Sequence, residues 1–251
     1  MADQKAIYPG LKGQTVLLTG GASGIGADIV RGFAAQGANV GFVDFDAAAS
    51  KAICEETGAT AQIADLRDIP ALKEAFATLI SELGAPRVLV NNAARDDRHG
   101  WEDVTEDYYD ERIATNLRHM FFATQACAPA MIEAGQGGAI VNMGSNSWWE
   151  ASGGMPVYTT AKSAVHGMTR SFARDLGPHR IRVNTIVPGW IMTERQKELW
   201  VTEDAMKKHL ARQCLPDPIQ PDEVAQMVLF LSSDAASACT ATNFFVEAGS
   251  V

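Results

Sequence analysis

Short apolar runs alternate with longer amphipathic segments along the whole 251-residue chain. The apolar runs have the length of strands and no clean polar alternation, a pattern typical of strands buried on both faces. The predicted strands are Thr15–Thr19, Asn39–Val43, Thr60–Ala64, Val88–Asn91, Ala139–Met143, Arg182–Ile186 and Asn243–Val246. The predicted helices are Gly24–Gln36, Asp46–Thr57, Asp68–Leu83 and one that begins near Asp107. This order predicts an α/β fold with a seven-stranded parallel sheet and helices on both faces.

One segment, from Trp190 to Pro218, interrupts the alternation. It is charged and helical in pattern, and it follows the sixth strand, at the edge of the sheet where open α/β folds bind ligands. We predict a substrate lid over residues 190–218, with an ordinary pair of surface helices as the alternative. Neither a linker nor a repeat divides residues 1–251, which favours a single domain.

Composition limits the partners. The net charge of −9 argues against nucleic acid or an anionic membrane, because both are bound through an excess of Lys and Arg. The N-terminus lacks the apolar core of a signal peptide, and no apolar run reaches the ~20 residues that span a bilayer. Cys54, Cys127, Cys214 and Cys239 form no C-x-x-C pair, which predicts reduced thiols in a cytoplasmic protein and neither a disulfide nor a metal site.

A glycine-rich turn, Thr19–Gly26, directly follows the first strand and opens a helix. Glycines at this place let the backbone approach a pyrophosphate, whose charge the helix N-terminus favours. The spacing is G-x-x-x-G-x-G, which indicates one branch of the Rossmann dinucleotide-binding proteins. The candidate contacts are Gly20, Ser23, Gly24, Ile25 and Gly26.

Asp44 ends the second strand, twenty residues after Gly24. An acid there accepts hydrogen bonds from the ribose hydroxyls of the cofactor and repels a 2′-phosphate, which predicts NAD. A plain loop-start aspartate is the alternative, but it leaves the spacing unexplained. Asp65, with Leu66 beside it, fits a contact to the adenine, and Asn92 after the fourth strand would pass under the cofactor.

Tyr158 and Lys162 stand four residues apart, and Ser145 lies thirteen residues before the tyrosine. If this segment is helical, the phenol and the ammonium share one face. A tyrosine pKa is normally ~10, and a nearby positive charge favours the phenolate and lowers it. Taken alone, such a pair is more often a packed ring and a surface amine.

Together, these motifs resemble the classical short-chain dehydrogenases/reductases: TGGASGIG, NNAA, Ser145 before Y-x-x-x-K, and Pro188-Gly189. The resemblance covers nearly the whole chain. There are two departures: Ala94 replaces a usual glycine, and Glu247-Ala248-Gly249 replaces the usual D-G-G. The resemblance implies a single-domain Rossmann fold, an oxidoreductase that acts on CH–OH groups, and a homotetramer.

The resemblance also implies roles for individual residues. Tyr158 would be the general base and Ser145 would hold the reacting oxygen, while Lys162 would hold the nicotinamide ribose and lower the tyrosine pKa. Asn116 would support a water-linked proton path to the lysine. The implied contacts to the nicotinamide end are Pro188, Ile191 and Thr193.

A narrower resemblance is to bacterial NAD-dependent sugar 1-dehydrogenases, those acting on D-xylose above all. It rests on five runs: Asp96–His99, Asp110–Ile113, Asn116–Met120, Ser145–Trp148 and PGWIMTERQ from Pro188. The candidate substrate residues are Asp96, His99, Ser145, Asn146, Trp148, Tyr158 and Trp190. Amides, carboxylates and indoles suit a sugar, which presents several hydroxyls and an apolar ring face, better than they suit a steroid or fatty acyl chain.

The resulting hypothesis is oxidation of a cyclic aldose at C1 to the aldonolactone with NAD. One alternative is another secondary alcohol, such as a keto-deoxy sugar acid whose carboxylate Arg95, Arg98 or Arg195 would bind. A non-catalytic dinucleotide-binding protein is the third hypothesis. The presence of Ser145, Tyr158, Lys162 and Asn116 argues against it.

Overall fold

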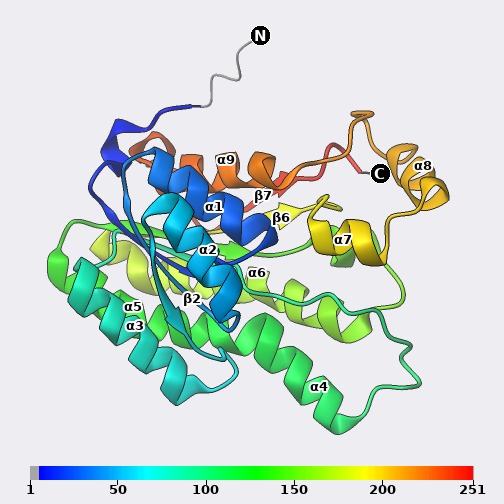
Figure 1. The fold of residues 1–251 in the computed structure, drawn as a ribbon, viewed down its shortest axis with the longest axis horizontal. Helices are drawn as coiled ribbons and strands as arrows, with labels where there is room; N and C mark the ends of the chain where they lie inside the picture. The colour runs from blue at the N-terminus through cyan, green and yellow to red at the C-terminus, as the bar shows by residue number, and fades with distance from the viewer. Residues whose placement is uncertain (1–5, 251) are drawn as a thin grey trace.

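The computed structural model describes residues 6–250, within which seven parallel strands form one sheet (Figure 1). Their order across the sheet is β3-β2-β1-β4-β5-β6-β7. The strands are β1 Thr15–Thr19, β2 Asn39–Asp44, β3 Thr60–Ile63, β4 Val88–Asn91, β5 Gly138–Met143, β6 Ile181–Pro188 and β7 Asn243–Val246. The predicted parallel sheet is confirmed. β6 is longer than predicted because Val187 and Pro188 pair with Phe245 and Val246 of the edge strand β7.

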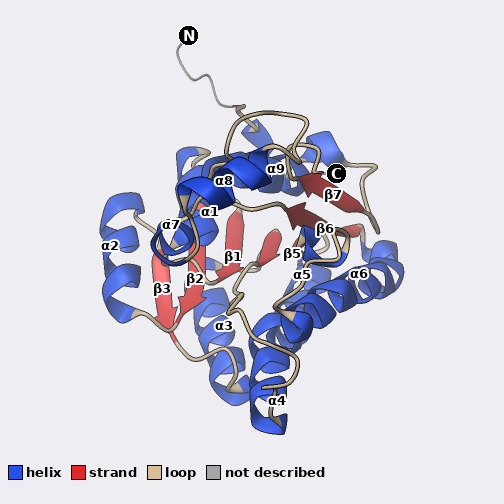
Figure 2. Ribbon diagram, turned by 90° about the vertical axis from the view of Figure 1, so that its right-hand side faces the viewer, coloured by secondary structure: helices blue, strands red, loops and turns tan. Residues whose placement is uncertain are grey.

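Helices cover both faces of the sheet, as Figure 2 shows. One face carries α1 (Gly24–Ala35), α2 (Ala47–Thr57) and α9 (Pro221–Ser232). The other face carries α3 (Ile69–Leu83), α5 (His119–Ala134) and α6 (Pro156–Leu176). The predicted single-domain Rossmann architecture is therefore confirmed.

The core explains why the strands read as continuous apolar runs. In β1, Val16 and Leu18 pack into the core beneath α1 and α9, while Leu17 between them packs into the core beneath α3 and α5. Successive side chains of a strand point to opposite faces, and here both faces are covered. Each core holds a fully buried phenylalanine, Phe33 or Phe76, and burying such a side chain contributes about 1.5–3 kcal/mol.

The helix predicted from near Asp107 consists of three joined parts. α4 (Glu106–Ile113) begins at Thr105, whose side chain accepts a hydrogen bond from the backbone N–H of Tyr108. It continues into a π-helical stretch, Ala114–Arg118, and then into α5. A π stretch accommodates an extra residue in one turn, and such stretches are frequent at functional sites.

The segment 190–218 contains two short helices, α7 (Glu194–Leu199) and α8 (Glu203–Leu210), at the carboxyl edge of the sheet (Figure 1, right). Thr193 and Thr202 each accept a hydrogen bond from a backbone N–H in the first turn of the helix that follows. Threonine is a favoured residue at this position because it satisfies one of the unpaired N–H groups of a helix start.

Within residues 6–250, every helix is too short or too polar to cross a lipid bilayer, and no group of three or more His, Cys, Asp or Glu side chains could hold a metal ion. The four cysteines are free thiols.

Candidate active site

A cavity of about 1240 Å³ lies at the carboxyl ends of the strands. Most of the residues that the sequence singled out line this one cavity. They are Gly20, Ser23, Gly24, Ile25, Gly26, Asp44, Asp65, Leu66, Asn92, Asp96, Ser145, Asn146, Tyr158, Lys162, Pro188, Trp190, Ile191 and Thr193. Three others, His99, Asn116 and Trp148, are not part of its lining.

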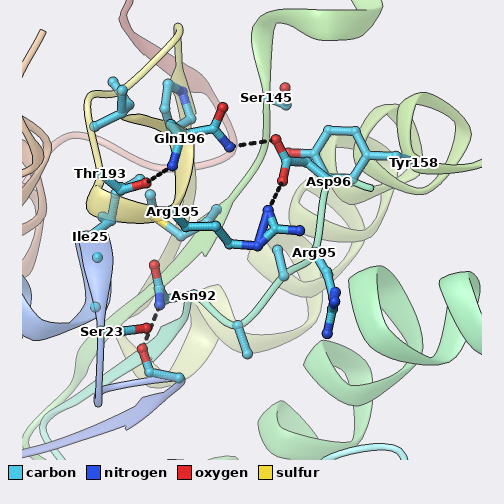
Figure 3. A pocket seen from close by; sticks show the side chains of 18 of the residues that line it. Ser23, Ile25, Asn92, Arg95, Asp96, Ser145, Tyr158, Thr193, Arg195 and Gln196 are labelled. Atoms are coloured by element: carbon cyan, nitrogen blue, oxygen red, sulfur yellow. Dashed lines mark hydrogen bonds and ion pairs between the residues drawn. The ribbon is translucent and has the colours of Figure 1, made fainter. Parts of the chain in front are cut away.

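The glycine-rich turn after β1 has a shape that only glycine permits at two positions. A Cβ on Gly26 would lie 1.7 Å from the Gly20 carbonyl oxygen, which no real contact allows. Gly24 has a φ of +52°, in the left-handed region that favours glycine. The Asn92 side chain donates to the Gly20 carbonyl at 2.7 Å and so braces the turn from β4 (Figure 3). The turn therefore presents bare backbone and the start of α1 to the cavity.

Asp44 lies buried at the end of β2 and faces the same turn. Its carboxylate accepts hydrogen bonds from the backbone N–H groups of Ala22, at 3.0 Å, and Asp46, at 3.1 Å. Arg31 of α1 also lines this end of the cavity, but its guanidinium is bound to Glu56 at 2.7 Å and 2.8 Å. The acid predicted from spacing is thus in the cavity wall, and the nearby cation already has a partner.

Asp65 also reaches the cavity, but with its carboxylate engaged. It accepts hydrogen bonds from the backbone and the guanidinium of Arg67, and these interactions lower its pKa. Arg67 continues to Glu111 of α4 at 2.9 Å. The contact of Asp65 and Leu66 with adenine remains a prediction.

Ser145, Tyr158 and Lys162 meet where β5 ends and α6 begins. Ser145 follows β5, and its hydroxyl accepts a hydrogen bond from the backbone of Ser147 at 3.1 Å. Lys162 is 1% exposed; its Nζ donates to the Met143 carbonyl at 2.7 Å and lies 5.8 Å from the centroid of the Tyr158 ring. The phenol and the amine share one helix face, as the spacing predicted.

The ionisation of Tyr158 and Lys162 differs from the expected one. Burial, then the carboxylate of Asp96, raises the pKa of Tyr158 to about 12, while a hydrogen bond with Ser145 and the charge of Arg98 lower it. Burial lowers the pKa of Lys162 to about 7. The expectation that Lys162 brings the tyrosine pKa below 10 was therefore wrong for this structure, because burial disfavours the charged form of both groups.

Asn116 lies fully buried in the π stretch, behind the cavity wall. Its side-chain oxygen accepts from the Arg95 backbone at 2.8 Å, and its nitrogen donates to the Arg112 carbonyl at 3.0 Å. These bonds tie the loop that follows β4 to α4. The proton path through Asn116 stays a prediction.

The loop after β4 and the segment 190–218 are joined across the mouth of the cavity. Asp96 accepts from Arg195 and Gln196 of α7, and Figure 3 shows its carboxylate between them and beside Tyr158. The indole nitrogen of Trp190 donates to the Gln196 side-chain oxygen at 2.8 Å. The predicted lid region is thus in contact with the loop that carries Asp96.

A second connection links α8 to the segment after β5. Glu150 accepts from the Asn146 side chain and from Arg212 at 3.3 Å. The indole of Trp190 packs edge-on against His209 of α8, with the ring centroids 5.1 Å apart. Asn146 and Trp190 both border the cavity, and Asn146 is linked to Arg212 of segment 190–218 only through Glu150.

Trp148 and His99, both predicted to contact substrate, lie elsewhere. Trp148 ends a short 3₁₀ turn, Asn146–Trp148, in which successive side chains point about 120° apart, so that Asn146 faces the cavity and Trp148 stacks on His166. His99 accepts a hydrogen bond from the Val157 backbone at 3.2 Å and contacts the Tyr108 hydroxyl at 3.0 Å. It thus supports the first turn of α6, the helix that carries Tyr158.

Sequence reasoning missed several cavity residues, namely Arg31, Arg67, Glu150 and Gln196. Gln196 lies within the run PGWIMTERQ and had no distinguishing signal of its own. Its partner Asp96 is 100 positions away, and contacts of that range depend on how the sheet is wound.

The fold and the site together define a dinucleotide-binding oxidoreductase of the doubly wound α/β class. A family model described as enoyl-(acyl carrier protein) reductase matches residues 20–250. The chain is 48% identical to a D-xylose 1-dehydrogenase of Caulobacter vibrioides, over 97% of this chain and 98% of that one. It is 47% identical to a probable galactose dehydrogenase of Rhizobium meliloti, over 96% of each chain.

Solved structures with a similar fold support the same class of protein. A mutant of a Serratia marcescens short-chain dehydrogenase/reductase superposes with a TM-score of 0.89 at 32% identity, covering 96% of this chain and 98% of that one. A blue fluorescent protein from a metagenomic library, in complex with NADPH, superposes with a TM-score of 0.85 at 33% identity, with the same coverage. This chain belongs to the short-chain dehydrogenase/reductase family, and it is an oxidoreductase.

Proposed function

We propose that this enzyme oxidises a neutral aldose at C1 to the aldonolactone, with NAD as the hydride acceptor. The observation that carries the proposal is the position of Ser145, Tyr158 and Lys162, at the junction of the glycine-rich turn and a polar mouth that includes Asp96. The likeness to relatives named as xylose and galactose dehydrogenases, at nearly half identity over the full chain, supports the choice of substrate class.

The residues present fit a nicotinamide dinucleotide. The turn around Gly26 is a cradle that a single Cβ would fill, and it exposes the start of α1, which suits a pyrophosphate. Asp44, Lys162 and Thr193 all line the cavity, where Asp44 would hold the adenosine ribose and the other two the nicotinamide end. When bound, the cofactor supplies the acceptor for the C1 hydride. We propose NAD over NADP because the Asp44 carboxylate would repel a 2′-phosphate and Arg31 is already paired.

The protein's own residues handle the proton. Tyr158 takes the proton of the C1 hydroxyl, and Ser145 holds the oxygen on which the carbonyl forms. Because the Tyr158 pKa is raised to about 12, this transfer becomes easier as the pH rises. Lys162, with a pKa of about 7, is a suitable next proton carrier near neutral pH, and Asn116 would support a water-linked path to it.

The competing substrate class, a keto-deoxy sugar acid, is disfavoured by charge. Of the three arginines that would hold its carboxylate, Arg95 and Arg195 are already paired with Asp97 at 2.8 Å and 2.5 Å, and Arg98 packs over the Trp200 ring. The decisive experiment is to measure NADH formation with a panel of aldoses, keto-deoxy sugar acids and simple secondary alcohols. We expect aldoses to have the highest kcat/KM; a preference for sugar acids would contradict the proposal, and no turnover of any alcohol would favour the non-catalytic alternative.

Asp44→Asn tests the cofactor assignment. The amide keeps an acceptor for one backbone N–H but loses the charge, and a hydrogen bond to a charged group is worth about 1.5–3 kcal/mol, so we expect roughly a 10- to 100-fold rise in KM for NAD. Discrimination against NADP should fall. The matched control is Asp68→Asn, because Asp68 accepts an equivalent backbone hydrogen bond at the start of α3, away from the cavity. Equal weakening of NAD and NADP would count against the assignment.

We also propose a homotetramer and a cytoplasmic location. Phe121 of α5 is 45% exposed and packs against Phe172 of α6, so these two helices present an aromatic surface suited to a second copy. The four free cysteines suit a reducing compartment. Light scattering coupled to size-exclusion chromatography tests the assembly, and a monomer at micromolar concentration would refute it.

A further inference from the structure

Two consecutive aspartates in the loop after β4 have different environments. Asp97 accepts from Arg95 at 2.8 Å, from Arg112 at 2.6 Å and from Arg195 at 2.5 Å. The Arg112 side chain is only 7% exposed, so this carboxylate is anchored to the interior of the protein. The hydrogen-bonding capacity of Asp97 is therefore spent on fixing the loop.

Asp96 instead faces the cavity beside Tyr158 (Figure 3). Its two oxygens accept from Arg195 at 3.2 Å and from Gln196 at 2.7 Å, both on α7. An ionised carboxylate offers about four lone-pair positions, so acceptor capacity remains toward the cavity. Its charge is one of the causes that raise the Tyr158 pKa.

The charges of this cluster balance. It contains four guanidinium groups and four carboxylates, those of Arg67, Arg95, Arg112, Arg195, Asp65, Asp96, Asp97 and Glu111. Within this cluster no guanidinium is left over for an anionic substrate, and Arg98, which also lines the cavity, packs over the Trp200 ring. Its member beside Tyr158 is an anion, which repels a second carboxylate and accepts hydrogen bonds from hydroxyls.

Building on the proposed aldose oxidation, we propose that Asp96 determines specificity: its carboxylate binds the sugar hydroxyl next to the reacting one, at C2, and excludes sugars that carry a carboxylate. Arg195 and Gln196 are the positioning residues that aim it. A site built to bind a substrate hydroxyl strongly rejects the analogue that lacks it, because its polar group is then left unpaired. The 2-deoxy aldose is therefore the informative probe.

α7 completes this site. The Gln196 side-chain oxygen is occupied by the Trp190 indole N–H, which fixes the amide so that its nitrogen points to Asp96. Thr193 caps the helix and holds its first turn in place. Correct placement of α7 is therefore needed before Asp96 is aimed at the sugar.

The first test is Asp96→Asn, assayed with an aldose, its 2-deoxy analogue and the matching uronic acid. We expect the wild type to prefer the aldose over the 2-deoxy sugar by at least ~10-fold, and this preference to shrink toward one in the variant. Activity on the uronic acid relative to the aldose should rise by a similar factor. The loss on the aldose should appear mainly in KM, with the Kd for NAD unchanged.

The pH profile gives a second readout. The charged groups around Tyr158 are Asp96 and Arg98 from the loop after β4, Lys162 from α6 and Arg195 from α7. Removing the Asp96 charge lowers the Tyr158 pKa, so the rising limb of kcat/KM should move to lower pH. Arg195→Met leaves Asp96 less neutralised and should move the limb to higher pH.

The positioning role is tested by Arg195→Met and Gln196→Leu, which should each reduce the preference over the 2-deoxy sugar. Lys197→Met is the matched control, because Lys197 stands on the same helix and pairs with the exposed Glu194. It should change neither the preference nor the pH profile.

The outcomes separate this inference from the proposed function. If the wild type oxidises aldoses but Asp96→Asn keeps the full preference over the 2-deoxy sugar, the role of Asp96 is overturned and the function stands. If no aldose is oxidised, the function fails. In that case, opposite pH shifts of the Asp96 and Arg195 variants on the true substrate support the placement of Asp96, and their absence overturns it.

Discussion

Tyr158→Phe is expected to lower kcat for aldose oxidation by roughly 10²- to 10⁴-fold, the range contributed by a positioned general base. Phenylalanine keeps the ring that contacts Lys162 but has no hydroxyl to accept the proton. The phenol group is not needed to hold the pyrophosphate or the adenosine. The Kd for NAD should therefore change by less than about twofold, which is the effect of losing one weak contact. Steady-state kinetics and a fluorescence titration with NAD measure the two effects.

Tyr109→Phe is the matched control for this substitution. Tyr109 lies on α4 with its side chain exposed, outside the cavity lining, so kcat should stay at the wild-type value. Retention of full activity in Tyr158→Phe would remove the tyrosine from the reaction and, with it, the proposed proton transfer.

Gly26→Ala is expected to destroy the cofactor site. The new methyl group would sit 1.7 Å from the Gly20 carbonyl oxygen and 2.7 Å from the Asn92 side-chain nitrogen, so the turn must open. Overpacking of this kind costs about 1–3 kcal/mol of stability, and often more when backbone must move. We expect NAD binding to fall below detection in calorimetric titration while urea unfolding shows a fold that is weakened but present.

Gly167→Ala adds the same methyl group as Gly26→Ala but is expected to stabilise the protein. Gly167 lies inside α6, and nothing approaches within 4 Å of the position its Cβ would take. Alanine is the better helix former, so stability should rise by roughly 0.5–1 kcal/mol with NAD affinity unchanged. A normal Kd for NAD in Gly26→Ala would show that the turn does not hold the cofactor.

The features that the sequence predicted well are local. The strands follow from apolar runs, since a strand covered on both faces needs no polar side, and β1 shows this directly through Val16, Leu17 and Leu18. The glycine-rich turn, Thr19–Gly26, is eight residues long, and the Tyr158–Lys162 pair spans one helical turn. Such features depend on neighbours in the chain, so a pattern of residues is sufficient to find them.

The features that the sequence could not place depend on the direction and the environment of a side chain. Asn146 and Trp148 lie two residues apart in one 3₁₀ turn, in which side chains point in different directions. Asn146 therefore borders the cavity, while Trp148 stacks on His166. His99 was assigned to the substrate from its place in the loop. It instead supports α6 through the Val157 backbone, a contact across 58 positions.

The sequence by itself determined the fold class, the glycine-rich turn and the candidate reacting side chains, since periodicity and short spacings encode all three. Only the tertiary structure decided the ionisation of Tyr158 and Lys162: the pKa of Tyr158 goes up and that of Lys162 goes down, chiefly because both groups are buried. It also decided which of two adjacent aspartates faces the cavity. That choice follows from Arg112 and Arg195, brought together from α4 and α7 by the winding of the sheet.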